Sequence, residues 1–163
     1  MRKFSTHLFR ITMILGLLIF STSIIAQTPG WMNVQNIGGS NHDYIRAMTR
    51  DSDGNIYLAG AFQSSITIDT ITVSVDQYAG SYSLFVAKLN SDYEVQWINY
   101  ANGYEGTYAE DITVDSSKNV YVAGEYSYDT YFGDITLTED DLGSVYIAKL
   151  NSNGEWQWAA KGY

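Results

Sequence analysis

One stretch of this chain occurs twice. Residues 51–60 have the sequence DSDGNIYLAG, and residues 115–124, which lie 64 positions later, have the sequence DSSKNVYVAG. In each copy, turn-forming residues lead into an apolar run rich in β-branched and aromatic side chains, which predicts a tight turn followed by a buried strand. Internal repetition of this kind favours an architecture of similar units, such as the blades of a propeller or the turns of a solenoid.

A second block is also repeated. Residues 85–97 align without a gap with residues 146–158, at an offset of 61, and residues 132–138 occupy the place of residues 66–73. One strand is predicted three times, each time marked by a tryptophan: Trp31, Trp97 and Trp158. No helical periodicity follows the first 26 residues, so the rest of the chain is predicted to be all-β.

The strand pattern predicts how the sheets are stacked. Residues 56–62 and 120–123 are apolar at consecutive positions, as expected for strands buried on both faces. The glycines of the two Ala-Gly pairs, Gly60 and Gly124, remove side-chain bulk where we expect a neighbouring sheet or the axis of the ring to come close. We therefore predict two four-stranded antiparallel sheets, each stacked against others like the blades of a propeller.

The repeated motifs resemble those of the bacterial seven-bladed beta-propeller repeat (SBBP-type) family. The resemblance rests on the Asp-rich turn, on NIYLAG and NVYVAG, on FVAKLN and YIAKLN, and on EVQW and EWQW, and it covers residues 31–163. It implies a β-propeller fold and an exported or surface-displayed protein. We place repeat 1 at residues 31–96, repeat 2 at residues 97–157 and the start of a further unit at residues 158–163.

Two blades make an incomplete ring, because propellers have about four to eight blades. The outer faces of both sheets would then stay uncovered. The resemblance therefore implies partners in the form of further blades, which belong either to the same longer chain or to another protein. The family pattern itself indicates no substrate, and fold analogy does not name one.

The N-terminal residues predict a signal peptide at residues 1–26, which leaves the repeat region at residues 27–163. Basic residues are followed by the apolar run 11–20 and then by small residues before Ala26. A membrane anchor is the competing interpretation, but a spanning helix needs about 20 apolar residues and Ser21, Thr22 and Ser23 interrupt this run. The predicted location is therefore secreted or at the cell surface.

The composition narrows the range of partners. Without residues 1–26, the six remaining Lys and Arg stand against 18 Asp and Glu, for a net charge of −12. A surface this acidic repels nucleic acids and anionic lipid headgroups, so we predict no nucleic-acid partner and no membrane insertion after signal cleavage. The chain has no cysteine, so an exported form would be stabilised without disulfides.

The sequence gives poor signals for catalysis, and we predict no enzyme, no cofactor and no metal site. The Asp-x-Asp-Gly run at Asp51 resembles the start of a calcium loop, but its twelfth position is Phe62 where that loop needs Glu, so a hairpin turn is predicted. His42 is the only histidine after the leader and has no nucleophile motif beside it. Glu94 and Glu155 precede the same Gln-Trp pair in both repeats, which favours a role in the repeat itself.

Binding is the stronger class of function. Six tyrosines predicted at loops or strand ends are candidates for stacking on sugars or for filling the space between blades: Tyr100, Tyr104, Tyr108, Tyr126, Tyr128 and Tyr131. Arg46 and Arg50 depart from the repeat, since their counterparts are Glu110 and Val114, and such departures are places for partner contacts. We predict a non-enzymatic scaffold or interaction module. The alternatives are a carbohydrate-binding or adhesin-type module that uses these tyrosines, and the repeat portion of a larger secreted hydrolase.

Overall fold

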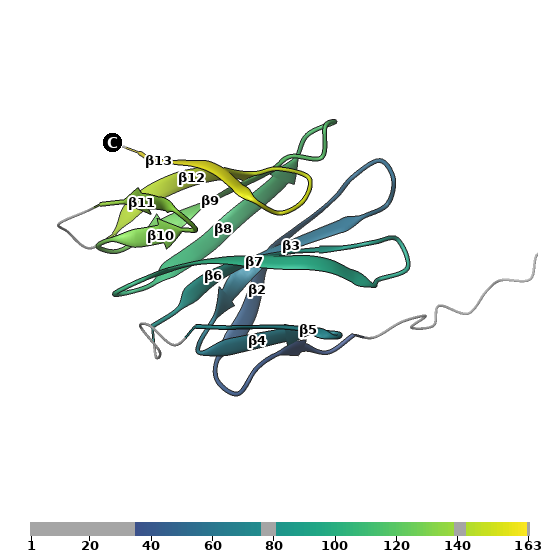
Figure 1. Cartoon of the computed structure of the whole chain (residues 1–163), viewed down its shortest axis with the longest axis horizontal. Coiled ribbons are helices and arrows are strands. Elements are labelled where there is room, and N and C mark those ends of the chain that lie inside the picture. Colours follow the sequence, from purple (N-terminus) through teal and green to yellow (C-terminus); the bar gives the residue numbers. More distant parts are fainter. Residues whose placement is uncertain (1–34, 76–80, 139–142, 163) are drawn as a thin grey trace, which may run out of the picture. The chain divides into compact units, whose positions relative to one another are not determined.

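The computed structural model describes residues 35–75, 81–138 and 143–162. These residues form thirteen β-strands in three antiparallel sheets and contain no helix (Figure 1). The all-β prediction is therefore confirmed. The predicted signal peptide and the predicted strand at Trp31 lie outside the described residues.

Two four-strand meanders account for most of the structure. The first meander consists, in spatial order, of β2 (Asp43–Arg50), β3 (Ile56–Phe62), β6 (Ser83–Leu89) and β7 (Val95–Gly103). The second meander repeats this order with β8 (Thr107–Val114), β9 (Val120–Tyr126), β12 (Ser144–Leu150) and β13 (Trp156–Lys161). Figure 1 shows the two meanders as successive layers.

A short hairpin is inserted into each meander. The first hairpin, β4 (Ser65–Ile68) and β5 (Ile71–Ser74), lies between β3 and β6 in sequence, and the second, β10 (Thr130–Phe132) and β11 (Ile135–Leu137), lies between β9 and β12. A turn at Asp69 and Thr70 joins β4 to β5. The second hairpin thus occupies the place of the first, as predicted, but the register aligns residues 130–137, and not 132–138, with residues 66–73.

The hairpins join the sheets in a way that the predicted pair of separate four-stranded sheets did not include. β10 pairs with the end of β7, where Thr130 lies opposite Gly103, and this pairing makes the first sheet six-stranded. The first hairpin pairs in the same manner with β1 (Ile37–Gly38), where Gly38 lies opposite Thr67, to form the three-stranded sheet. β7 is the edge strand of the first meander, so its open hydrogen-bonding side can accept β10.

Both meanders share their irregularities. The pairing of β2 with β3 shifts register between Ile45 and Ala47, and that of β8 with β9 shifts between Ala109 and Asp111, 64 residues later. A Cβ atom on Gly60 would lie 2.0 Å from the carbonyl oxygen of Tyr44. The glycine is therefore required by the bulged neighbouring strand of its own sheet, and not by a neighbouring sheet as predicted.

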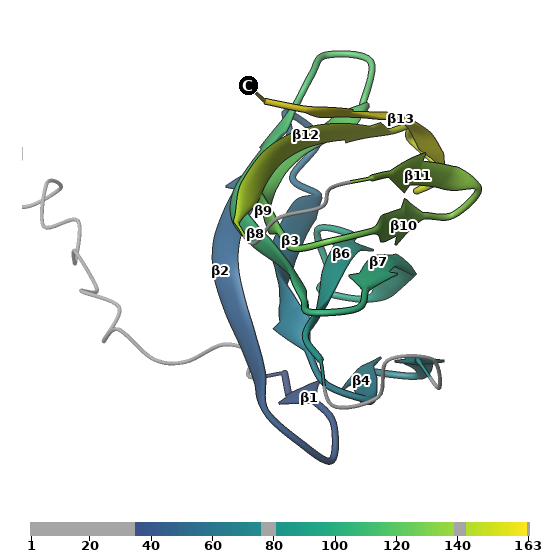
Figure 2. The same ribbon diagram turned by 90° about the vertical axis from the view of Figure 1, so that its left-hand side faces the viewer.

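The core has two parts, one on each face of the first meander. We call the face that packs on the second meander the front face; it contributes Tyr57, Ala59, Leu84 and Val86. The opposite, back face packs under the β4–β5 hairpin (Figure 2) and contributes, among others, Leu58, Phe62, Phe85 and Leu89.

The prediction of strands buried on both faces is confirmed for β3 and is wrong for β9. Six of the seven residues of β3 are buried, whereas buried and partly exposed residues alternate along β9. The back face of the second meander packs on the first meander through residues such as Val120, Val122 and Leu150. Its front face has no sheet on it in the part of the chain that the structure describes, and this accounts for the alternation.

Candidate interaction surface

The two meanders contact each other through side-chain hydrogen bonds, and this contact shows which positions of a meander bind a neighbouring one. Trp97 on β7 donates a hydrogen bond from Nε1 to the carbonyl oxygen of Ser152 at 3.3 Å, and the Asn99 amide donates to the carbonyl of Gly154 at 2.6 Å. In return, Trp156 Nε1 donates to the carbonyl of Tyr100 at 3.0 Å. These bonds attach the β12–β13 turn of the second meander to the outer strand of the first.

An aspartate organises the turn between the first two strands of each meander. One carboxylate oxygen of Asp51 accepts from the backbone N–H groups of Asp53 and Asn55, both at 2.9 Å, and the other accepts from the Asn55 amide at 2.8 Å and from the Tyr57 hydroxyl at 3.1 Å. Asp115 holds the second turn in the same manner through Ser117, Asn119 and Tyr121. The hairpin-turn prediction is therefore confirmed.

A lysine of the second turn reaches across to the first turn. Lys118 Nζ lies 3.2 Å from Oδ2 of Asp51 and 2.9 Å from Oδ2 of Asp53. Burial alone would raise the pKa of Asp51, but the hydrogen bonds from Asn55, Lys118 and Tyr57 outweigh burial and hold this pKa well below its usual range. The hydrogen bond to Asp53 is the main cause that raises the pKa of Lys118.

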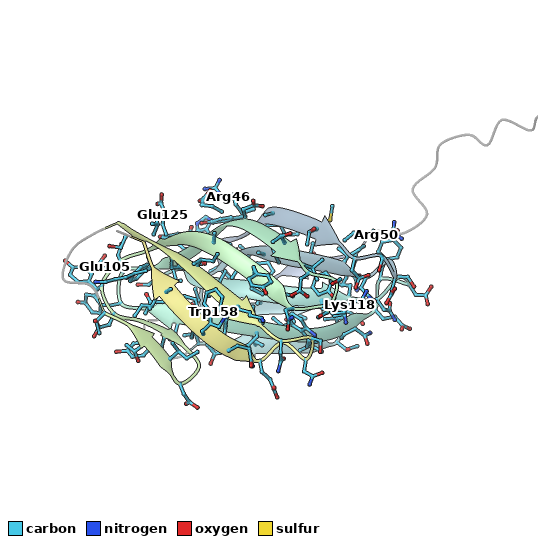
Figure 3. All side chains as sticks on the ribbon, turned by 90° about the horizontal axis from the view of Figure 1, so that it is seen from above. Arg46, Arg50, Glu105, Lys118, Glu125 and Trp158 are labelled. Atoms are coloured by element: carbon cyan, nitrogen blue, oxygen red, sulfur yellow. The ribbon has the colours of Figure 1, made fainter. Side chains whose placement is uncertain are left out.

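A second ion pair links β2 to β8. Arg46 Nη2 lies 3.0 Å from Glu110 Oε1, and both side chains are about half exposed. The repeat places these two residues at the same position of successive meanders, 64 residues apart. The opposite charges at one repeat position therefore connect the two meanders. Figure 3 shows that Arg46 lies well apart from Lys118, so the two ion pairs join the meanders at separate places.

The front face of the second meander is the candidate interaction surface, because it exposes residues whose counterparts are buried in the first meander. Val145 and Ile147 are 52% and 45% exposed, whereas their counterparts at an offset of 61, Leu84 and Val86, are both fully buried. Trp158 on β13 (Figure 3) is 40% exposed. Adjacent exposed large apolar side chains on one sheet face indicate a surface for contact.

This open face keeps the side-chain arrangement of the covered one. On the first meander, Tyr57 lies 6.3 Å from Trp97 between ring centroids, and Lys88 Nζ lies 5.6 Å from the centroid of the Tyr57 ring. On the second meander the corresponding distances are 6.2 Å between Tyr121 and Trp158 and 5.4 Å from Lys149 to the Tyr121 ring. The surface is thus already arranged without a partner on it.

The back face of the first meander exposes the complementary set. Ile45 and Met48 on β2 are 47% and 68% exposed, whereas their counterparts on β8, Ala109 and Ile112, are 0% and 5% exposed because they pack on the first meander. Beside Ile45 lies a half-open hollow, which is also lined by Ile66 and Phe85. Uncovered outer faces were expected from the small number of blades, but the residues that line them were not identified from the sequence.

The six candidate tyrosines do not form one group. Tyr126 is fully buried at the end of β9 and Tyr100 is half-buried within β7, so these two fill space in the core. Tyr108 and Tyr131 are half-buried within β8 and β10. Tyr104 is exposed in a loop, and its ring lies edge-to-face 6.1 Å from the ring of Tyr128.

The residues weighed for catalysis lie in separate turns and loops. Each repeated glutamate accepts a hydrogen bond from the asparagine that starts its own turn, at 2.7 Å from Asn90 to Glu94 and at 2.7 Å from Asn151 to Glu155. His42 is exposed between β1 and β2. Among the described residues, no group of three His, Cys, Asp or Glu is placed to hold a metal ion. The predictions of no enzyme, no metal and no cofactor stay predictions.

None of residues 35–75, 81–138 and 143–162 lies in a helix that is long and apolar enough to span a bilayer. The apolar run 11–20 lies outside these described residues.

Comparisons with known proteins agree with the internal repeat. No curated protein matches the chain. The model of the SBBP family, described as a beta-propeller repeat, matches residues 34–61 and 96–125. Both matched segments contain the Asp-organised turn and end in the strand that follows it, β3 in one and β9 in the other. Two segments of the chain therefore match the beta-propeller repeat of the SBBP family.

Proposed function

We propose that the chain is an exported, non-enzymatic propeller-type module that acts as a scaffold or interaction module at the cell surface. Its two meanders are two blades of a propeller, and its partners are further blades that cover its open faces. The two segments that match the beta-propeller repeat support the propeller part of the proposal, and the predicted signal peptide at residues 1–26 supports export.

The observation that carries the proposal is the pair of open faces. The front face of the second meander presents the apolar positions that the first meander buries against its neighbour, and it is already arranged for contact. Repeat proteins are stabilised largely by contacts between successive units, so an uncovered unit face favours the docking of another unit. Two blades are fewer than the roughly four to eight of known propellers.

The architecture is tested by adding a third unit in register. Because Tyr163 aligns with Asn102 at the offset of 61, a second copy of residues 103–162 is attached directly after Tyr163. The added unit is expected to cover Val145, Ile147 and Trp158, to raise the thermal unfolding midpoint by more than about 10 °C and to shift tryptophan fluorescence to shorter wavelength. The matched control carries Ile147→Glu in the original unit and is expected to show no such gain.

Two results would contradict the architecture. One is an unfolding midpoint that does not change when the third unit is attached. The other is a gain of equal size in the Ile147→Glu control, because the added unit would then be stable without packing on the open front face. Export is tested separately by N-terminal sequencing of protein recovered outside the cytoplasm. A start at Gln27 is expected, and a product that retains residues 1–26 would contradict the predicted signal peptide.

A sugar-binding module is the second candidate function, supported by the exposed Tyr104 and the half-buried Tyr128 whose ring contacts it. Tyrosine rings at such positions can stack on the apolar face of a sugar ring. The test is a glycan array with the wild-type chain and the Tyr104→Ala variant. Binding that disappears in the variant would support this function, and an array without signal for the wild type would exclude it for the sugars present.

A further inference from the structure

We propose that a second copy of this chain covers the open front face of the second meander, and that it binds there head to tail through the back face of its own first meander. This inference rests on the proposed function, since it names the source of the further blades. The contact repeats the one between the two meanders of a single chain. It is heterologous, so it uses different surfaces on the two copies and can continue to a closed ring.

The apolar residues of the two faces match because each set corresponds, at equal repeat positions, to one side of the contact between the two meanders of a single chain. The front face offers Val145, Ile147 and Trp158, which correspond to the residues that receive β8 and β9 within the chain. The back face offers Ile45 and Met48, which correspond to Ala109 and Ile112 of the docked meander. These five residues are therefore the two halves of one interface, exposed at opposite ends of the repeat array.

The charges match as well. Within the chain, Arg46 of the first meander pairs with Glu110 at the same position of the second meander. A second copy docked in the same manner places its own Arg46 beside Glu110, so that Arg and Glu alternate from one meander to the next. The first repeat has Arg at this position and the second has Glu, which is the arrangement that a head-to-tail contact between copies requires.

Arg50 supplies the second cation. Within the chain, Lys118 neutralises Asp51, and the position of Lys118 corresponds to Gly54 in the first meander. The Arg50 guanidinium lies at this glycine: its Nε donates to the carbonyl of Gly54 at 3.3 Å, and a Cβ on Gly54 would lie 2.8 Å from Nη2. Figure 3 shows Arg50 and Lys118 at the same end of the meanders. In the docked copy, Arg50 therefore faces Asp115, the counterpart of Asp51.

The β4–β5 hairpin is already paired with β1 when a copy docks. Within the chain, β10 pairs with β7 at Asn102 and Gly103, and the register makes Gly38 of β1 the counterpart of Asn102. β1 and the β4–β5 hairpin of a docked copy therefore meet the end of β13 as a finished three-stranded sheet.

One residue opposes the contact and gives a diagnostic variant. Glu125 is exposed near the end of β9, where its counterpart in the first meander is the fully buried Ala61. A carboxylate that loses water at an apolar contact weakens the contact unless a cation pairs with it. Glu125→Ala is therefore expected to strengthen the association of two copies, by about tenfold in the dissociation constant.

The test uses the full chain and two variants that each alter one face. Met48→Glu places a charge on the back face, Ile147→Glu places one on the front face, and both positions are exposed within a single chain. The masses of the wild type and of each variant are measured by sedimentation between about 1 µM and about 100 µM. Tyr104→Glu, at an exposed position in the loop between β7 and β8, is the matched control.

The expected pattern is specific to head-to-tail contact. The wild type and Tyr104→Glu increase to at least twice the monomer mass with concentration, whereas Met48→Glu alone and Ile147→Glu alone stay monomeric. A mixture of these two variants forms a 1:1 dimer and nothing larger, because only the intact front face of one can bind the intact back face of the other. A mixture that stays monomeric would overturn the proposal.

Two further outcomes would also overturn it. One is a wild type that remains monomeric at the highest concentration, and the other is a Met48→Glu variant that associates as strongly as the wild type. Either result leaves the proposed function testable, because the chain with an attached third unit measures whether a blade covers the front face at all. Failure in that chain as well would refute both the second-copy proposal and the propeller architecture.

Discussion

The two front faces can be compared by making the same chemical change on each. Val86 lies on the covered front face of the first meander and is fully buried, whereas Val145 lies on the open front face of the second and is 52% exposed. Val86→Ala removes two methyl groups, which contribute about 0.8 kcal/mol each, and leaves a cavity. The expected loss in the free energy of unfolding is therefore about 2 kcal/mol. For Val145→Ala the expected loss is about 0.5 kcal/mol or less.

The assay is urea unfolding followed by circular dichroism, with a thermal scan as a second measurement. Both are performed at about 1 µM, a concentration low enough to disfavour association between copies. For the roughly 120 residues that the structure describes, a loss of 2 kcal/mol lowers the thermal midpoint by about 8 °C, and Val145→Ala should change it by about 2 °C or less. Equal losses for the two variants in a monomeric chain would refute the assignment of an open front face.

Three further predictions concern the turns. Asp51→Asn destabilises the chain near neutral pH. The pKa of Asp51 is lower in the folded chain than in the unfolded chain, so the charged carboxylate contributes stability that is present above the unfolded pKa and is lost as the pH falls toward the folded pKa. The difference in unfolding free energy between wild type and variant should therefore shrink from about pH 6 to about pH 2. Lys118→Met should lower the thermal midpoint, since it removes the cation shared by two aspartates. Gly154→Ala should lower the midpoint by several degrees, because its Cβ would lie 2.6 Å from the Trp97 ring at a backbone φ of +82°.

Each of these predictions has a control and a result against it. For Asp51→Asn the control is Asp92→Asn in an exposed turn, and a gap that stays constant with pH would contradict the hydrogen-bonded carboxylate. Lys118→Arg should keep most of the midpoint that Lys118→Met loses, and equal loss in both would argue against the ion pairs. For Gly154, the matched change is Gly143→Ala, where no atom lies within 4 Å of the added Cβ. A larger effect at Gly143 would contradict the packing of Trp97 on the turn.

The turns and the strands beside them could be predicted from the sequence because their causes are local. Asp51, Asn55 and Tyr57 lie within seven residues of one another and satisfy each other's hydrogen bonds, so the same motif at Asp115 gives the same turn. β3 could be predicted as buried on both faces from its unbroken apolar run. The same argument was wrong for β9, because its burial depends on whether another sheet covers the front face.

The features that could not be predicted depend on contacts between distant residues. The pairing of Thr130 with Gly103 joins the second hairpin to the first sheet, and neither residue carries a sequence signal for that partner. The interaction surface depends on which of two equivalent positions is covered: the sequence shows Leu84 and Val145 as similar apolar residues, and only their packing distinguishes them. The arginines at 46 and 50 could be identified as departures from the repeat, but their contacts with Glu110 and with the carbonyl of Gly54 could not.

The pairing of β10 with β7 has a consequence for how the chain comes apart. Part of the second repeat is a strand of the first repeat's sheet, so the first repeat cannot open at this edge while the second stays folded. A protease that cuts the short connection at Tyr104 would therefore leave the two pieces bound to each other. Under a pulling force applied to the ends, the two repeats should likewise yield in one step rather than in succession.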